Sequence, residues 1–208
     1  MSFFPNKTYD KISLYISDYS EQIAKAFKSI DSSQMQRAAD TLEDAVINDH
    51  RIFVCGNGGS AAISNHLCCD FVKGMRTGTK FAPNVHSLST NVEIITAIAN
   101  DVSFEDVFSF QLSSHARPGD VLITISSSGG SPNIISAIEW ARNNGVRTIA
   151  MSGFSGGKSR KISDISLHVE AENYGVIEDV HQSLMHILAQ YVRQMKLTNR
   201  DLLGSVKF

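Results

Sequence analysis

Five short apolar runs that alternate with helical patterns limit the possible folds of this chain more than any other feature. The runs are RIFVC, NVHSL, DVLITI, VRTIAM and ISLHV, at residues 51–55, 84–88, 120–125, 146–151 and 165–169. Helical spacing of apolar residues lies between most of them, at residues 60–73, 91–114 (as one or two helices), 132–144 and 176–196. Strands that alternate with helices are typical of a parallel sheet with helices on both faces. The sequence therefore predicts an α/β fold.

Two more helical patterns precede the first predicted strand. One covers residues 8–28, and the other follows Asp31-Ser32-Ser33, residue types that favour the N-terminal cap of a helix. Their apolar side chains suit the core of the domain and a contact between subunits equally well, and the sequence does not separate the two. We expect a helical extension, an α/β domain and a short tail, over residues 1–50, 51–197 and 198–208.

Composition excludes several classes of protein. A chain of 208 residues suits one domain with one sizeable core. The net charge is −2 and lysine and arginine form no run, which argues against nucleic-acid binding. Three cysteines, two of them adjacent, are typical of a reducing compartment. The first residues lack the pattern of a signal peptide, and no apolar stretch approaches the roughly 20 residues that span a bilayer. We expect a cytoplasmic protein without nucleic-acid or membrane partners.

The first apolar run leads into a glycine-rich turn, GNGGS, and then into a helix. Gly58 and Gly59 permit positive φ angles and a close approach of the backbone to a ligand. Ser60 can cap the helix, whose free N–H groups favour an anion. The turn also fits the dinucleotide pattern G-x-G-x-x-A, but that site needs an acidic residue at the end of the second strand. Residues 87–91 read SLSTN, so we favour a phosphate over a dinucleotide.

The third apolar run leads into a serine-rich loop, SSSGGS, at residues 126–131. Pro132 follows and suits the first turn of a helix, where its missing N–H costs nothing. Small hydroxyl residues without a lysine fit a sugar phosphate better than a nucleoside triphosphate. A loop that merely caps its helix is the alternative. Two such loops, each after a strand, favour a phosphate site.

These motifs resemble the sugar isomerase (SIS) domain. The resemblance rests on GNGGS at 56–60, SSSGGS at 126–131 and AIANDVSFEDVF at 97–108, and it extends from about residue 30 to about residue 196. Within this class the sequence is similar to the phosphoheptose isomerases, which interconvert sedoheptulose 7-phosphate and D-glycero-D-manno-heptose 7-phosphate. The resemblance implies a five-stranded parallel sheet in a flavodoxin-like α/β/α sandwich. It also implies a homotetramer with active sites at subunit contacts.

The resemblance further implies one zinc ion per subunit. Carried over position by position, its ligands are His66, Asp70, Glu178 and His186. Asp70 stands where the heptose isomerases usually have Glu, and Glu178 stands where they have Gln, but all four side chains are competent ligands. Gly175-Val176 replaces an Asp-Arg pair of those enzymes, which keeps a related sugar phosphate open as the substrate.

Helical spacing supports this metal site in part. His66 and Asp70 are four residues apart, so they project from one face of a helix and can hold one ion. Glu178 and His186 are eight apart, a rise of about 12 Å, which is long for two ligands of one ion. Either the last helix begins after Glu178, or neighbouring subunits share each site. We assign structural roles to the other histidines, which are His50, His86, His115, His168 and His181.

An aldose–ketose isomerase moves a proton between C1 and C2 and must stabilise the enediolate formed on the way. We expect Asp70 to abstract this proton and His186 to handle the proton on oxygen, with the cation as Lewis acid. A carboxylate that binds a metal tightly is a poorer base, so the two roles of Asp70 are in tension. Ligation in the resting state, with release when substrate binds, would resolve it. The expected substrate-binding residues are Asn57, Gly58, Gly59, Ser60, Asp101, Ser126, Ser127, Ser128, Ser131 and Glu178. For Asp101, a cap at a helix boundary is the alternative.

Some SIS proteins catalyse nothing, such as a bacterial group that associates with the replication initiator. They share the glycine and serine loops, so these loops do not discriminate. They lack an acid at the position of Asp70 and a histidine at that of His186, and this chain has both. The sequence therefore favours an isomerase, and the resemblance suggests heptose precursors of lipopolysaccharide or capsule as its product.

Overall fold

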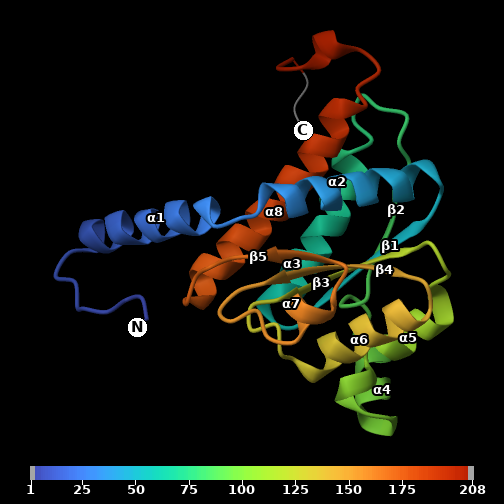
Figure 1. The fold of residues 1–208 in the computed structure, drawn as a ribbon, viewed down its shortest axis with the longest axis horizontal. Helices are drawn as coiled ribbons and strands as arrows, with labels where there is room; N and C mark the ends of the chain where they lie inside the picture. Colours follow the sequence, from blue (N-terminus) through green and yellow to red (C-terminus); the bar gives the residue numbers. More distant parts are fainter. Residues whose placement is uncertain (1–2, 206–208) are drawn as a thin grey trace.

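The computed structural model describes residues 3–205, which form three layers around one parallel sheet (Figure 1). Its strands are β1 (Arg51–Gly56), β2 (Asn84–Ser87), β3 (Val121–Ser126), β4 (Arg147–Ser152) and β5 (Ile165–His168). They lie in the order β2-β1-β3-β4-β5, and every neighbouring pair is parallel. The predicted five-stranded sheet is confirmed. In sheets of this order the chain changes direction between β1 and β3, where ligands commonly bind.

Helices cover both faces of the sheet. They are α1 (Ile12–Lys28), α2 (Ser32–Ile47), α3 (Gly59–Cys69), α4 (Val92–Asp101), α5 (Ser109–His115), α6 (Pro132–Asn143), α7 (Ser159–Ile162) and α8 (Tyr174–Met195). Short turns of helix cover Asp70–Gly74, Phe104–Asp106 and Arg200–Leu202. The region 91–114 contains two α-helices, and α7 was not predicted. Asp31 caps α2 as predicted, because its carboxylate accepts from Ser33 N at 2.8 Å and Gln34 N at 3.3 Å.

Alternate residues of the central strands contribute to two separate hydrophobic cores, one on each face of the sheet. Val54 and Ile123 pack with α2, α3 and α8 on one face of the sheet. Phe53 and Leu122 pack with α4, α5 and α6 on the other. Successive side chains of a strand point to opposite faces, so strands buried on both sides read as unbroken apolar runs. The three-layer α/β/α prediction is therefore confirmed.

The two N-terminal helices differ in what they bury. Helix α2 buries Ala38, Ala39, Leu42 and Ala45, and it belongs to the core. Helix α1 buries only Ala26 and leaves Ile12, Leu14 and Ile16 exposed. It extends away from the body of the molecule (Figure 1). Of the two roles left open by the sequence, α2 covers the core, whereas α1 carries an apolar surface that its own chain does not cover.

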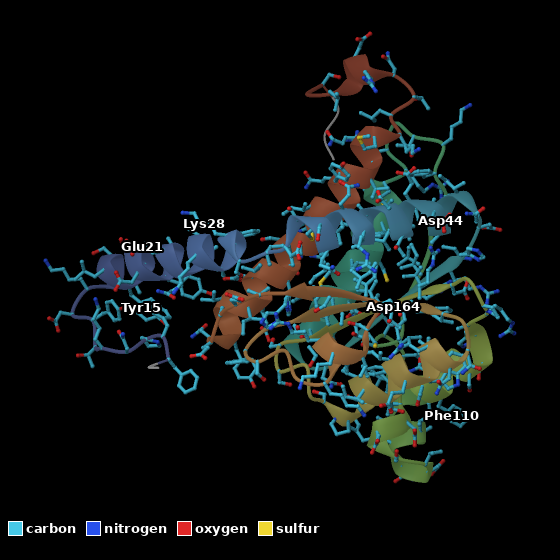
Figure 2. The ribbon with its side chains drawn as sticks, viewed as in Figure 1. Tyr15, Glu21, Lys28, Asp44, Phe110 and Asp164 are labelled. Carbon is cyan, nitrogen blue, oxygen red and sulfur yellow. The ribbon has the colours of Figure 1, made fainter. Side chains whose placement is uncertain are left out.

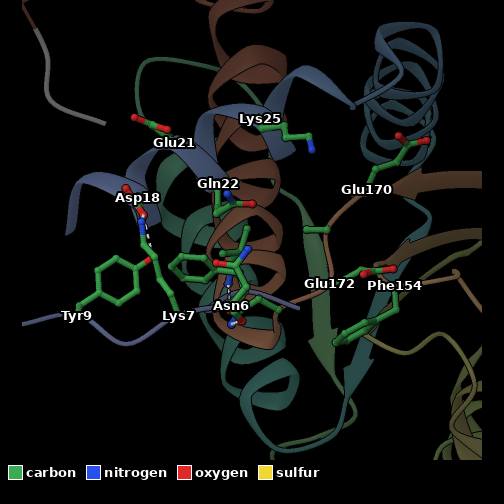
Figure 3. A pocket seen from close by; sticks show the side chains of 14 residues that line it. Asn6, Lys7, Tyr9, Asp18, Glu21, Gln22, Lys25, Phe154, Glu170 and Glu172 are labelled. Atoms are coloured by element: carbon green, nitrogen blue, oxygen red, sulfur yellow. Dashed lines mark hydrogen bonds and ion pairs between the residues drawn. The ribbon is translucent and has the colours of Figure 1, made fainter. Parts of the chain in front are cut away.

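The N-terminal segment packs beneath α1. Tyr15 lies on the side of α1 that faces this segment (Figure 2), with its ring centroid 5.4 Å from that of Phe4 and 5.0 Å from that of Tyr9. A hollow of about 740 Å³ lies between this region and the loops after β4 and β5, and Lys7 pairs with Asp18 at 2.9 Å along its wall (Figure 3). None of the residues predicted to bind substrate or metal lines this hollow.

Within residues 3–205, the helices lack the combination of length and apolar character that crossing a membrane requires.

Candidate active site

A carboxylate and two imidazoles meet where α3 packs against α8. We call His66, Asp70 and His186 the imidazole cluster. Asp70 Oδ1 lies 3.5 Å from His66 Nε2, and Asp70 Oδ2 lies 2.5 Å from His186 Nδ1. The two rings meet edge to face with centroids 5.0 Å apart. Each residue offers one ligand atom within 4.8 Å of the others, so this structure brings together three of the four predicted ligands.

Asp70 lies at the point where α3 changes its geometry. The chain continues from α3 into one turn of π-helix over Asp70–Gly74, and Met75 N bonds back to Asp70 O at 3.1 Å. Phe71 in this turn is fully buried. Turns of π-helix inside longer helices occur frequently at functional sites. The wider turn keeps Phe71 in the core while Asp70 faces α8, and the sequence alone did not reveal it.

Gln182, which the sequence analysis did not single out, joins the imidazole cluster. Its Nε2 atom lies 2.7 Å from His66 Nδ1 and 3.2 Å from His186 Nε2. The two imidazoles therefore stand between Asp70 on one side and Gln182 on the other. The signal was present in the sequence, because Gln182 and His186 are four residues apart on one helix and share a face.

Glu178, the fourth predicted ligand, does not belong to this group. Helix α8 begins at Tyr174, so the hypothesis that the last helix starts after Glu178 is wrong. The carboxylate of Glu178 lies instead over the start of α3. A β-carbon at Gly59 would lie 2.7 Å from Glu178 Oε2, so glycine makes room for this close approach. Glu178 thus faces the glycine turn and not the imidazole cluster.

The glycine turn differs in one detail from the prediction. Gly58, with φ of 53°, is the N-cap of α3, and no side chain caps this helix. The prediction that Ser60 caps it is wrong, since Ser60 lies inside the first turn and is buried. Asn57 forms a reciprocal amide pair with Asn133, at 2.9 Å in both directions. Asn133, overlooked as a functional residue, thereby joins the glycine turn to the start of α6.

The serine loop uses two of its hydroxyls to hold its own backbone. Ser126 Oγ accepts from Gly129 N at 3.2 Å, and Ser128 Oγ accepts from Gly130 N at 3.3 Å. Ser131 is the N-cap of α6, but its side chain makes no capping bond. Ser127 Oγ is buried and has no hydrogen-bond partner among the described residues. Buried hydroxyls normally have a partner, so Ser127 and Ser131 keep hydrogen-bonding capacity that a ligand can use.

Asp101, Cys68 and Cys69 do not belong to the imidazole cluster. Asp101 is exposed as the last residue of α4, and its carboxylate accepts from Asn100 Nδ2 at 2.7 Å, a contact between side chains and not a helix cap. Cys68 lies between His66 and Asp70 in sequence, and burial raises the pKa of its thiol to about 11. A neutral thiol is a poor metal ligand. Cys69 is exposed and does not belong to the group around His66.

The donor atoms of the imidazole cluster fit a divalent transition metal. Two imidazole nitrogens and a carboxylate oxygen are the donors that catalytic zinc sites commonly use, and such sites keep a position open for substrate. The other described histidines lie outside this group. The arrangement provides a site for a metal ion on α3, about 10 Å along the helix from the glycine turn that can bind an anion.

Comparisons with known proteins agree with this arrangement. Residues 15–153 match the SIS domain. Over 185 residues the chain is 36% identical to the phosphoheptose isomerase of Akkermansia muciniphila, a match that covers 88% of this chain and 97% of that protein. The solved phosphoheptose isomerase of Neisseria gonorrhoeae matches with a TM-score of 0.79 at 32% identity, over 87% of this chain and 96% of that one. The enzyme of Francisella tularensis matches with a TM-score of 0.80 at 27% identity, over 90% and 99%.

The fold and the two strand-end loops thus place the chain in the SIS-domain family. Within that family it belongs to the phosphoheptose isomerases, and it is an isomerase enzyme.

Proposed function

We propose that the protein converts sedoheptulose 7-phosphate into D-glycero-D-manno-heptose 7-phosphate. The contact between Asp70 Oδ2 and His186 Nδ1 carries the proposal, because it joins a base and an acid from separate helices. Both groups lie on helices that meet at the glycine turn, where α8 approaches Gly59. The names of the relatives in Akkermansia and Neisseria support this substrate.

In this mechanism Asp70 takes the proton that moves between C1 and C2, and His186 gives and accepts the proton on the substrate oxygen. The short contact between them orients both groups before substrate arrives. A divalent cation held by His66, Asp70 and His186, which we propose is zinc, would supply Lewis-acid stabilisation of the enediolate.

The phosphate end of the substrate would lie at the two loops. Backbone N–H groups at Gly58 and Gly59 can bind an anion, since they begin a helix of eleven residues. The serine hydroxyls proposed to assist are those of Ser60, Ser126, Ser127, Ser128 and Ser131. Asn57 would orient a sugar hydroxyl. Asp101 is proposed for the same role on sequence grounds alone.

We also propose a cytoplasmic homotetramer with active sites at subunit contacts. The exposed side chains of Ile12, Leu14 and Ile16 on α1 support association, because a second copy can cover them. The cellular product would be a heptose precursor of lipopolysaccharide or capsule. Gly175-Val176 stands where the phosphoheptose isomerases have an Asp-Arg pair, so a related sugar phosphate is the second candidate substrate.

The test is isomerisation of sedoheptulose 7-phosphate by wild type, Asp70→Asn and His186→Ala, with and without added zinc. We expect each substitution to lower kcat/KM by about a hundredfold or more, because each removes one proton-transfer group. His115→Ala, at an exposed histidine of α5, is the matched control and should keep full activity. Isomerisation that survives in both site variants would show the mechanism to be wrong. Pentose and hexose phosphates assayed in parallel decide between the two substrate candidates.

A further inference from the structure

Gln182 contacts both imidazoles of the imidazole cluster at once. Its side chain is partly buried on α8, with Nε2 2.7 Å from His66 Nδ1 and 3.2 Å from His186 Nε2. Asp70 meets the other nitrogen of each ring. Its Oδ1 lies 3.5 Å from His66 Nε2, and its Oδ2 lies 2.5 Å from His186 Nδ1. The four side chains therefore form a closed ring of contacts, with Asp70 and Gln182 at opposite nitrogens of both imidazoles.

This arrangement gives Asp70 and Gln182 different tasks. An ion held by His66, Asp70 and His186 binds the ring nitrogens that face the carboxylate. Gln182 then lies beyond the rings, on the side away from the ion. The nitrogens that face Gln182 carry the ring protons in that state. Histidines that bind a metal almost always donate this second N–H to a neighbouring acceptor, which fixes the orientation of the ring.

Packing alone does not hold the two rings. The side chain of His66 is 48% exposed and that of His186 is 35% exposed, whereas that of Asp70 is 12% exposed. An exposed ring can rotate unless hydrogen bonds fix it at both nitrogens. Asp70 supplies such a partner on one side of each ring, and Gln182 supplies it on the other.

The side-chain amide of Gln182 suits both rings with or without an ion. Without the ion, each ring donates to Asp70 and turns a lone pair to Gln182, whose NH₂ group has two hydrogens to donate. With the ion, both rings turn an N–H to Gln182, whose carbonyl oxygen has two lone pairs. A half turn of the amide exchanges its nitrogen and oxygen, so one side chain serves both states.

From this geometry we infer that Gln182 is a positioning residue, which holds His66 and His186 in place from the side opposite the ion. It does not touch the ion, and it acts on metal binding only through the two rings. The inference rests on the proposed function in one respect, the bound cation, and it does not depend on which sugar phosphate is the substrate.

Zinc binding tests the inference without a substrate. Wild type, Gln182→Leu and Gln182→Glu are stripped with a chelator, checked for folding by circular dichroism, and titrated with zinc in a calorimeter in slightly alkaline buffer. We expect Gln182→Leu to weaken zinc binding about tenfold or more, because it removes the partner of both ligating rings. Gln182→Glu should restore binding to within about threefold of wild type or better, since its carboxylate accepts from both ring N–H groups. Gln190→Leu, at an exposed glutamine of the same helix, is the matched control and should bind as wild type does.

Two results of this titration would overturn the inference. Unchanged zinc binding in Gln182→Leu would show that the rings need no partner on this side. Equally weak binding in Gln182→Leu and Gln182→Glu would show that the shape of the side chain matters and its hydrogen bonds do not. A wild-type protein without zinc affinity would overturn the inference together with the proposed cation site.

Cobalt spectra separate a positioning residue from a ligand. The visible absorption of Co²⁺ responds to a change of ligand, so Gln182→Leu at saturating cobalt should keep the band positions of wild type. A changed spectrum would make Gln182 a ligand and overturn the inference. Loss of isomerase activity toward every sugar phosphate, with these metal results intact, would instead refute the proposed function alone.

Discussion

Helix α8 carries two histidines whose surroundings are opposite. His186 is partly exposed on the face toward α3 and contacts Asp70 and Gln182. His181 is 0% exposed on the face toward the sheet, and within the described residues neither ring nitrogen makes a hydrogen bond of good geometry. Five residues turn a helix through about 500°, so the two side chains leave it about 140° apart. The face of the helix on which a histidine lies, and not its residue type, therefore decides whether it takes part in chemistry or only in packing.

The largest effect that follows from this comparison is on stability in acid. Burial lowers the pKa of His181 to about 4, and His168 nearby acts in the same direction, while the backbone at Ser152 offsets only part of it. The unfolded chain keeps the ordinary value of about 6.5. Between these values the unfolded chain binds a proton that the folded chain does not. The free energy of unfolding should therefore fall as the pH is lowered from about 6.5 to about 4, by on the order of 3 kcal/mol.

Urea unfolding of wild type and His181→Met at a series of pH values measures this effect. Methionine has a similar volume and does not titrate, so the variant should lose less stability in acid and remain folded at neutral pH. The groups of the imidazole cluster are present in both proteins, and their contribution cancels in the difference. Equal pH dependence in the two proteins would show that His181 is not the buried neutral group described here.

The packing of α8 against the sheet should also position the polar residues on its opposite face. Gly153, at the end of β4, lies against Ile177, and a β-carbon there would come within 2.5 to 2.7 Å of three Ile177 carbons. Gly153→Ala should therefore shift the start of α8 and lower the free energy of unfolding by about 1–3 kcal/mol. Glu178 follows Ile177 directly, so KM should also rise. The measurements are urea unfolding and steady-state kinetics.

Gly130→Ala is the matched control for Gly153→Ala. A β-carbon at Gly130 would meet nothing closer than Ser128 O at 4.0 Å, so this variant should match wild type in stability. If Gly153→Ala loses stability but keeps the wild-type KM, the two faces of α8 act independently, and packing against the sheet does not position Glu178.

The contrast between the two faces of α8 also shows how much of the fold and of the site could be predicted from the sequence. The five strands and both loops were predictable, because apolar runs mark buried parallel strands and the carboxyl ends of such strands meet at one edge. The meeting of His66, Asp70 and His186 was expected as well, from spacing and from the family resemblance. The resemblance led to Glu178 as the fourth ligand, and the place of Gln182 beside both imidazoles was missed. How far along α8 each residue lies from the imidazole cluster depends on the packing of α8 against α3, which puts Glu178 at Gly59 instead.

Besides α3 and the sheet, α8 contacts α1, and the smallest predicted effect lies at this contact. Tyr19 donates to Asp179 Oδ2 at 2.6 Å, and burial, followed by this carboxylate, raises the pKa of the Tyr19 hydroxyl. Tyr19→Phe removes this bond and leaves Asp179 hydrated, so it should cost about 1 kcal/mol and speed amide exchange in α1 more than in α8. Exchange read by mass spectrometry measures it, with Tyr15→Phe as control because ring packing holds Tyr15. Faster exchange throughout α8 would mean that α1 supports the whole helix. In that case the contrast between His181 and His186 depends on α1 as well as on the sheet.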